Sequence, residues 1–137
     1  MSCCGVTNRS TDRVFSLAAP WYYWRYRILG LDRHQRELVA GILDAGAEGA
    51  SVLEVGSGVG HLHHHLLQRG LGEAVGVELS GGMIDLARRL ARRHGVEERV
   101  RYRHGDFVEL ADDLPTADVT VLDRAVCCYP DAEAMIG

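Results

Sequence analysis

The chain has 137 residues, of which 47% are hydrophobic and 25% are charged, with 15 basic and 19 acidic side chains. This length and composition predict one compact globular domain over residues 1–137 and exclude a disordered, fibrous or two-domain chain. The formal net charge of -4 offers no basic field for phosphate backbones or anionic lipid, so we expect neither nucleic acid nor a membrane as partner. A small molecule is the expected substrate.

The N-terminus and the cysteines bear on location. Residues 1–5 lack the basic and long apolar segments of a signal peptide, and no apolar run in the sequence is long enough to span a membrane. The cysteines form two adjacent pairs, Cys3 with Cys4 and Cys127 with Cys128, and neighbouring cysteines bridge poorly because a disulfide needs separated Cα atoms. We therefore expect free thiols, no metal at the cysteines and a cytoplasmic location.

The first 50 residues divide into two segments. Residues 1–20 contain turn-forming polar residues and end at Pro20, which predicts an irregular arm. Residues 21–50 begin with a cluster of tryptophans and tyrosines and continue with helical periodicity, which predicts a helical region. Its aromatic side chains either pack in the core or form a lid over a flat or apolar ligand. The lid candidates are Trp21, Tyr22 and Tyr26.

From residue 51 onward, short β-branched runs alternate with amphipathic helical segments. This alternation is typical of βαβ units around a parallel sheet. The sequence therefore predicts an α/β, Rossmann-like core over residues 51–137 with about four strands and flanking helices. The predicted strands cover 51–55, 74–78, 100–104 and 118–123, and the predicted helices cover 59–69 and 81–94.

A glycine-rich loop joins the first predicted strand to the helix that follows it. Gly56, Gly58 and Gly60 allow positive φ angles and close approach of a ligand to the backbone, and the helix N-terminus offers unpaired N–H groups. Dinucleotide sites space their glycines as G-x-G-x-x-G, which this loop does not match. Glu54, two residues upstream, would repel a pyrophosphate but attract a cationic amino group. A nicotinamide-dependent oxidoreductase is therefore a less favoured alternative.

Two further acids follow later predicted strands. Glu78 ends the second strand, where its two oxygens can accept hydrogen bonds from a ribose diol. Asp106 follows the third strand and can accept a hydrogen bond from an exocyclic amine. Together with Glu54, these carboxylates match the amino group, ribose and adenine of S-adenosylmethionine.

The segment 51–123 resembles the N-terminal cofactor half of the class I S-adenosylmethionine-dependent methyltransferases. The resemblance implies that the glycine loop holds the methionine and ribose parts, that Glu78 binds ribose, and that Asp106 and the backbone of Phe107 hold adenine. It also implies an apolar wall near Met83. The candidate cofactor-binding residues are Glu54, Gly56, Ser57, Gly58, Gly60, Glu78, Leu79, Met83, Gly105, Asp106, Phe107, Asp123 and Arg124.

The segment 121–131, with the early aromatic segment, is similar to a bacterial subgroup related to magnesium-protoporphyrin O-methyltransferases. The D-P-P-Y motif of amino-group methyltransferases is absent, because Asp123 is followed by Arg124 and Ala125. The resemblance thus implies O-methylation of a small molecule. A carboxylate acceptor would need no base, whereas a hydroxyl acceptor could give its proton to Tyr129 or to a histidine. Tyr129 follows the fourth predicted strand, where substrate should approach, and is otherwise a packing residue. A cofactor-binding module without catalysis is the alternative.

Members of this family have further strands beyond the four predicted here, so the resemblance also implies an incomplete form of the fold. The strand over 118–123 would then form an edge, which favours a homodimer through that edge.

Four histidines follow the glycine loop: His61, His63, His64 and His65. His61 and His65 share a helix face, but the glutamate of an H-E-x-x-H zinc site is missing. We expect these side chains to face solvent or to pack near the cofactor, and we expect no metal.

Overall fold

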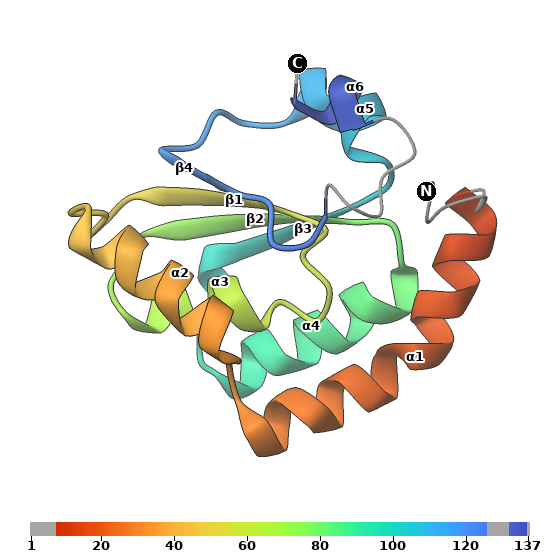
Figure 1. Ribbon diagram of the computed structural model, residues 1–137, viewed down its shortest axis with the longest axis horizontal. Coiled ribbons are helices and arrows are strands. Elements are labelled where there is room, and N and C mark those ends of the chain that lie inside the picture. The colour runs from red at the N-terminus through yellow and green to blue at the C-terminus, as the bar shows by residue number, and fades with distance from the viewer. Residues whose placement is uncertain (1–7, 126–131, 137) are drawn as a thin grey trace.

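The computed structural model describes residues 8–125 and 132–136, and within them a four-stranded parallel sheet has the order β3-β2-β1-β4. Figure 1 shows helices on both faces of this sheet. The predicted parallel α/β architecture is thereby confirmed, and each strand lies where the sequence predicts one. The strands are β1 (Ser51–Val55), β2 (Glu73–Glu78), β3 (Val100–His104) and β4 (Val119–Val121).

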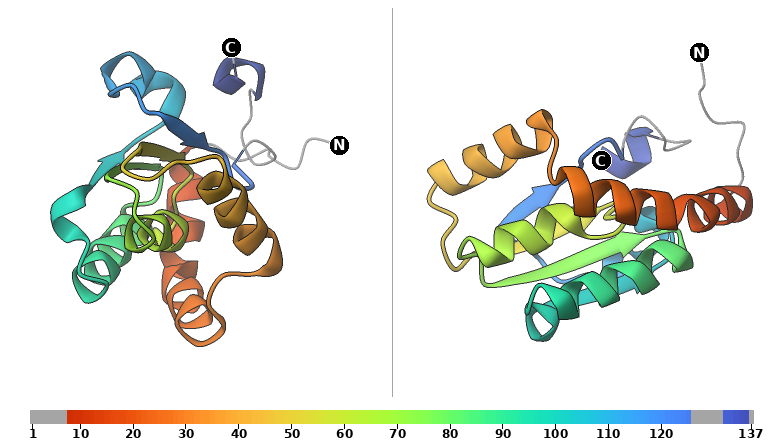
Figure 2. Two further views of the ribbon diagram at one scale, coloured as in Figure 1. Left: turned by 90° about the vertical axis from the view of Figure 1, so that its left-hand side faces the viewer. Right: turned by 90° about the horizontal axis from the view of Figure 1, so that it is seen from below.

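The larger helices lie below the sheet in Figure 1, and two short ones lie above it; Figure 2 shows the same layers from two other sides. No helix in the described parts of the chain combines the length and the apolar character that crossing a membrane requires. The lower helices are α1 (Asn8–Leu29), α2 (Arg33–Asp44), α3 (His61–Gln68) and α4 (Gly81–Arg93), and the upper ones are α5 (Phe107–Leu110) and α6 (Ala132–Ile136). Short 3-10 turns cover Glu97–Arg99 and Ala111–Asp113.

The central strand β1 is buried on both faces because it lies between two apolar layers. Val52 belongs to the cluster formed with α3, whereas Leu53 and Val55 belong to the cluster with Met135 of α6. Side chains alternate between the two faces of a strand, so Glu54 points to the same face as Val52. A carboxylate is thus placed beneath the first turns of α3.

The predicted irregular arm over residues 1–20 is wrong for residues 8–20, which form the first half of α1. Pro20 lies inside this helix instead of ending it. Proline removes one helical hydrogen bond and costs about 3 kcal/mol in a helix interior. Packing against α4 offsets that cost, since Phe15 and buried Ala19 contact the cluster that contains Met83. Tertiary contact has here overridden the local signal.

The last strand is shorter than predicted because the acids at its two ends have other roles. Asp118 accepts hydrogen bonds from the backbone N–H and the hydroxyl of Ser51, at 2.9 and 3.0 Å. Asp123 turns toward α2 and accepts a hydrogen bond from Gln35 at 2.9 Å. These contacts hold the neighbouring strand β1 and helix α2 against β4.

Candidate functional site

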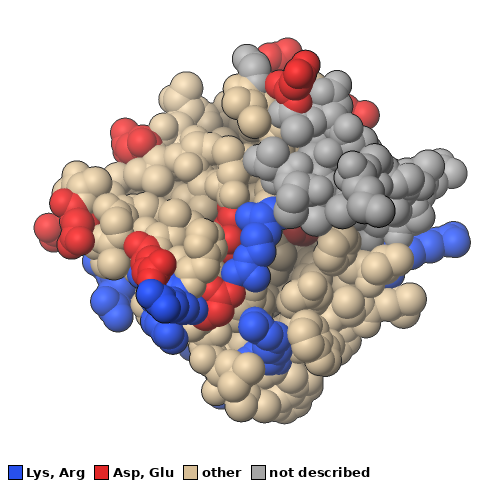
Figure 3. All heavy atoms as spheres, in the orientation of Figure 1, with Lys and Arg blue, Asp and Glu red and all other residues tan. Residues whose placement is uncertain are grey.

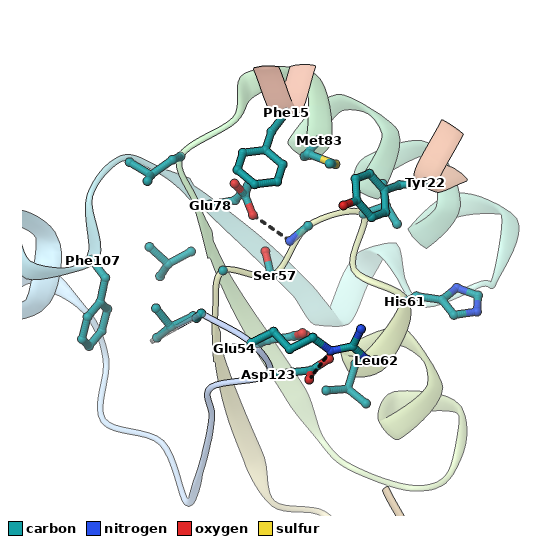
Figure 4. Close-up of a pocket in the computed structure, with 18 of the residues that line it drawn as sticks. Phe15, Tyr22, Glu54, Ser57, His61, Leu62, Glu78, Met83, Phe107 and Asp123 are labelled. Atoms are coloured by element: carbon teal, nitrogen blue, oxygen red, sulfur yellow. Dashed lines mark hydrogen bonds and ion pairs between the residues drawn. The ribbon is translucent and has the colours of Figure 1, made fainter. Parts of the chain in front are cut away.

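One cavity is lined by most of the predicted site residues, and we call it the main cavity. It lies at the carboxyl ends of β1, β2 and β4 and has a volume of about 390 Å³. The strand order places β2 and β4 on opposite sides of β1, and open α/β sheets bind ligands at such a switch point. Figure 4 shows residues from α1, the glycine loop and the ends of β2 and β4 around this space. The predicted residues that line it are Tyr22, Tyr26, Glu54, Gly56, Ser57, Gly58, Glu78, Leu79, Met83, Gly105, Phe107, Asp123 and Arg124.

The glycine loop forms the floor of the cavity in a conformation that favours glycine. Gly56, Gly58 and Gly60 have φ angles of 69°, 55° and 79°. A Cβ on Gly56 would lie 3.0 Å from Cβ of Ala125. The loop thus approaches the end of β4 closely, and its backbone is open to a ligand at Gly58, where a Cβ would meet no atom within 4 Å.

Ser57 is the residue of the loop that carries a polar side chain. Its backbone N–H donates to the carbonyl of Val77 at 3.1 Å, which ties the loop to β2. Its hydroxyl is buried, lines the cavity and has no hydrogen-bond partner within the described structure. A buried hydroxyl without a partner is costly, so a ligand or a water is expected to bind it.

Glu78 ends β2 and is held rigidly at the wall of the cavity. One carboxylate oxygen accepts from the N–H of Gly58 at 2.8 Å and the other from the N–H of Ser80 at 3.0 Å. Burial raises the pKa of Glu78, although the hydrogen bonds from Ser80 and Gly58 oppose that effect. Each oxygen retains acceptor capacity toward the cavity, which suits a vicinal diol.

Glu54 is the first member of a buried hydrogen-bonded chain that sequence reasoning did not predict. Its carboxylate lies 2.5 Å from Nδ1 of His63, and Nε2 of His63 lies 2.8 Å from the hydroxyl of Tyr102 on β3. The same hydroxyl lies 2.5 Å from Nε2 of His64. Both imidazoles are fully buried. This series of hydrogen bonds therefore connects the cavity wall to the side of α3 that faces the sheet.

The order of the protons along this chain follows from the chemistry of its members. Burial raises the pKa of Tyr102 and lowers that of His64 to about 2, so the phenol and this imidazole are both neutral. With His63 donating to Glu54, the Tyr102 hydroxyl donates to His63 and accepts from His64. Nδ1 of His64 is then a bare acceptor, and it has no partner within the described residues.

Gly60 does not line the cavity, because it covers the hydrogen-bonded chain of Glu54, His63, Tyr102 and His64 instead. A Cβ at Gly60 would lie 2.8 Å from Nε2 of His63, from Nε2 of His64 and from the Tyr102 hydroxyl. The third glycine of the loop is therefore required by the polar cluster beneath it. The sequence predicted a ligand contact at this position.

Asp106 also lies outside the cavity wall, although its neighbours Gly105 and Phe107 line it. Its carboxylate is buried and accepts from the N–H of Val108 at 2.9 Å, which caps α5. The described geometry thus gives Asp106 a structural role in fixing the turn that carries Phe107.

A polar cluster closes the cavity where β4 meets α2. Arg124, which has a positive φ of 56°, forms an ion pair with Asp32 and lies 3.4 Å from Asp123. The hydrogen bond from the N–H of Gln35 and the Arg124 guanidinium lower the pKa of Asp32. Gln35 bridges Asp123 and the hydroxyl of Tyr26 at 2.9 and 3.2 Å. This cluster links the end of β4 to the helices that cover the site.

The aromatic segment is divided between two sides of α1. Phe15, Tyr22 and Tyr26 line the cavity, and Tyr26 stacks on His61 with ring centroids 4.8 Å apart. Trp21 is 62% exposed and does not line the cavity, so its predicted place in the lid is wrong. Helical geometry explains the division, since residues 21 and 22 are separated by about 100° around a helix.

Several apolar lining residues were missed by sequence reasoning, because their types give no signal apart from that of the core. These residues are Phe15, Val55, Val59, Leu62, Val77, Ala125 and Met135. Gln35 of α2 was also missed, whereas His61, one of the four histidines singled out in the sequence, lines the cavity. The candidate catalytic Tyr129 and the two cysteine pairs lie outside the described residues. Among the described residues, no group of three or more His, Cys, Asp or Glu side chains is arranged to hold a metal ion.

Comparison with known proteins identifies the family. A family model described as a methyltransferase domain matches residues 52–136. The erythromycin 3''-O-methyltransferase of Saccharopolyspora erythraea is 30% identical over 119 residues, which cover 84% of this chain and 39% of that protein. Because the match includes more than half of the chain, the chain belongs to the methyltransferase domain family. It spans about two fifths of the length of this curated relative.

Solved structures agree with this assignment. A methyltransferase from Geobacter sulfurreducens, determined with S-adenosylhomocysteine, has 26% identity and a TM-score of 0.58, with 70% of this chain and 38% of that chain covered. The magnesium protoporphyrin IX methyltransferase from Synechocystis has 23% identity and a TM-score of 0.74, with 95% and 65% covered. The second likeness supports the fold, including the helices that precede β1.

Proposed function

We propose that this chain binds S-adenosylmethionine and transfers its methyl group to an oxygen of a small molecule. The observation that carries the proposal is Glu78, a buried carboxylate at the end of β2 whose two oxygens are fixed by Gly58 and Ser80 and border the main cavity. The family and the reaction of the Saccharopolyspora erythraea relative support the choice of oxygen as acceptor.

The residues present match the chemical groups of the cofactor. Glu78 would hold the ribose diol. The hydroxyl of Ser57, which has no partner among the described residues, and the open backbone at Gly58 would hold the amino-acid part. Glu54 would attract the amino group, and Phe107 with Met83 would provide apolar walls. When bound, S-adenosylmethionine supplies a methyl group on a sulfonium, an already activated leaving group.

The chain's own part in the reaction is to align the acceptor and to exclude water. Phe15, Tyr22 and Tyr26 cover the cavity from α1, and the link from Gln35 to Tyr26 holds this cover in place. His61 lies in the wall, where burial lowers its pKa to about 4. It is a neutral hydrogen-bond acceptor at pH 7, but a base this weak removes a proton from a hydroxyl inefficiently. A carboxylate acceptor would need no base.

A cofactor-binding module without catalysis is the second candidate. It is favoured by the weak basicity of His61 in the cavity wall, since burial lowers the pKa of this imidazole to about 4 and so weak a base accepts a proton from a hydroxyl inefficiently. The two candidates share the cofactor site and differ in turnover.

The test is calorimetric titration of the 137-residue chain with S-adenosylmethionine and S-adenosylhomocysteine. Glu78→Ala and Glu78→Gln are expected to weaken binding by about 100-fold, because each loses charge-assisted hydrogen bonds. Glu73→Ala is the matched control, since Glu73 is an exposed glutamate at the other end of the same strand. No binding by a folded chain, or equal binding by the Glu78 variants, would overturn the proposal. Binding without transfer to any hydroxylated or carboxylated acceptor would favour the non-catalytic module.

A further inference from the structure

Helix α1 has two opposite apolar faces. The inner face packs Phe15, Ala19 and Tyr22 against α4 and the cavity. The outer face carries five large apolar side chains at spacings of three and four residues, which align them along one side of a helix. We call them the outer stripe: Val14, Leu17, Trp21, Trp24 and Ile28, which are 60%, 83%, 62%, 54% and 74% exposed.

The outer stripe reverses the usual pattern of a surface helix, which places polar residues toward solvent. A contiguous exposed apolar patch of this kind marks an interaction site in a soluble domain. Both tryptophans of the chain belong to it. Tryptophan is enriched where an apolar phase meets water, because its ring is apolar and its N–H is polar.

The charged residues of α1 that flank the outer stripe are basic. Arg13 and Arg25 lie about 60° to either side of it on a helix of 3.6 residues per turn. Asp12 is the one acid in the sequence of α1, and it turns inward to accept from the N–H of Gly81 at 3.0 Å. In the lower right of Figure 3, where α1 lies, the visible surface is tan and blue, and the acidic side chains seen in this view lie at the left, at the top and in the centre.

From this arrangement we infer that α1 docks on an anionic lipid surface through the outer stripe. The tryptophans and aliphatic side chains enter the headgroup region, and the flanking arginines contact lipid phosphates. Figure 1 shows that α1 changes direction along its length, and Pro20 lies at the middle of the helix. A fluid surface accommodates this bend, whereas a straight partner helix would contact only half of the outer stripe.

The inference replaces the expectation that the chain has no membrane partner. That expectation used the net charge of the whole chain, but an interfacial helix depends on its local charge and apolar area. It is independent of the proposed methyl transfer, because none of the outer-stripe residues lines the cavity. Docking would nevertheless bring the cavity close to the lipid, since the inner face of the same helix covers it.

The two tryptophans make the proposal directly measurable in the unmodified chain. We expect their emission to shift to shorter wavelength with vesicles of phosphatidylcholine and phosphatidylglycerol, and to be quenched by lipids brominated on the acyl chain. Phosphatidylcholine alone should give a smaller shift, and salt should weaken binding to the anionic vesicles. If both vesicle types left the tryptophan emission unshifted and unquenched, the proposal would be overturned without the need for any variant.

A pair of variants locates the contact. Leu17→Asp combined with Ile28→Asp should reduce partition into anionic vesicles at least about tenfold, since both side chains would lose apolar burial. Ile136→Asp is the matched control, because Ile136 is 70% exposed on α6, on the other face of the sheet. Equal partition of the double variant and the control would overturn the proposal. So would a lipid-independent shift that grows with protein concentration together with a doubled mass in light scattering, because a second copy would then cover the outer stripe.

Discussion

Tyr102→Phe tests whether the buried chain from Glu54 to His64 stabilises the fold. The substitution removes one hydroxyl and keeps the ring, so it changes little in volume. It deprives Nε2 of His63 and Nε2 of His64 of contacts at 2.8 and 2.5 Å. Nδ1 of His64 already has no partner among the described residues, so this imidazole would lose its remaining hydrogen bond.

The magnitude follows from the cost of leaving polar groups unpaired. A buried donor or acceptor without a partner costs about 1–3 kcal/mol, and both affected imidazoles are fully buried. We therefore expect Tyr102→Phe to lower the free energy of unfolding by about 2–4 kcal/mol. Equilibrium urea unfolding, followed by far-UV circular dichroism, measures this quantity.

The same substitution elsewhere provides the control. Tyr23 carries an exposed hydroxyl that accepts from Arg27 at 3.5 Å. Tyr23→Phe should change the free energy of unfolding by less than about 0.5 kcal/mol. If the two variants lose equal stability, the hydroxyl of Tyr102 does not hold the histidines and the assigned proton order is wrong.

Three further outcomes are expected. Burial lowers the pKa of His64 from 6.5 to about 2, so on acidification the unfolded chain binds a proton at this residue before the folded chain does. His64 should therefore contribute about 2 kcal/mol to the unfolding free energy that is lost between pH 6.5 and about 5. Urea unfolding at several pH values measures this loss, and a His64→Phe variant whose unfolding free energy falls as steeply with pH would contradict it. Glu54→Gln should weaken the binding of S-adenosylhomocysteine but not that of 5'-methylthioadenosine, which lacks the amino group. If calorimetry showed equally weakened binding of both, Glu54 would not contact the amino group. Gly82→Ala should destabilise the chain despite the better helix propensity of alanine, since the new Cβ would lie 2.9 Å from Cα of Ser16. Gly41→Ala, whose Cβ would meet no atom within 4 Å, should raise the stability measured by thermal unfolding by about 0.5–1 kcal/mol. If both variants were stabilised, α1 would not pack closely on α4.

The strands and the glycine loop could be predicted because their signals are local. Runs such as Ser51–Val55 are short, β-branched and followed by glycine, and no competing helical pattern covers them. The acids at the strand ends are equally visible, since a parallel sheet gathers its carboxyl ends at one edge. Glu54 and Glu78 reach the cavity for this reason.

The polar chain beneath the loop could not be predicted, because it depends on contacts between distant segments. His63 and His64 are adjacent in the sequence, and a surface helix usually exposes at least one of two adjacent residues. Both are buried here because Tyr102, from β3, provides the polar partner between them. Histidine spacing alone carries no information about that tyrosine.

The first half of α1 was missed for the opposite reason, since its signals were present but divided, whereas the half from residue 21 onward was predicted as helical. The spacing of Val14, Leu17 and Trp21 is helical, yet the polar start of the chain and Pro20 favoured an irregular arm. The contacts with α4 that decide the matter lie more than 60 residues away in sequence, as in the 2.9 Å approach of the Ser16 and Ser80 hydroxyls.

Side chains of α1 cap the N-terminus of α4, so the position of α1 is thermodynamically coupled to ligand binding in the cavity that α1 covers. Asp12 and Ser16 accept from the N–H groups of Gly81 and Gly82, and Ser80 donates its own N–H to Glu78. A ligand that fixes Glu78 therefore favours the position of α1 in which it is packed on α4. By reciprocity, packing of α1 on α4 raises the affinity for that ligand by the same factor. Protease cleavage within α1 should accordingly slow as the site is saturated.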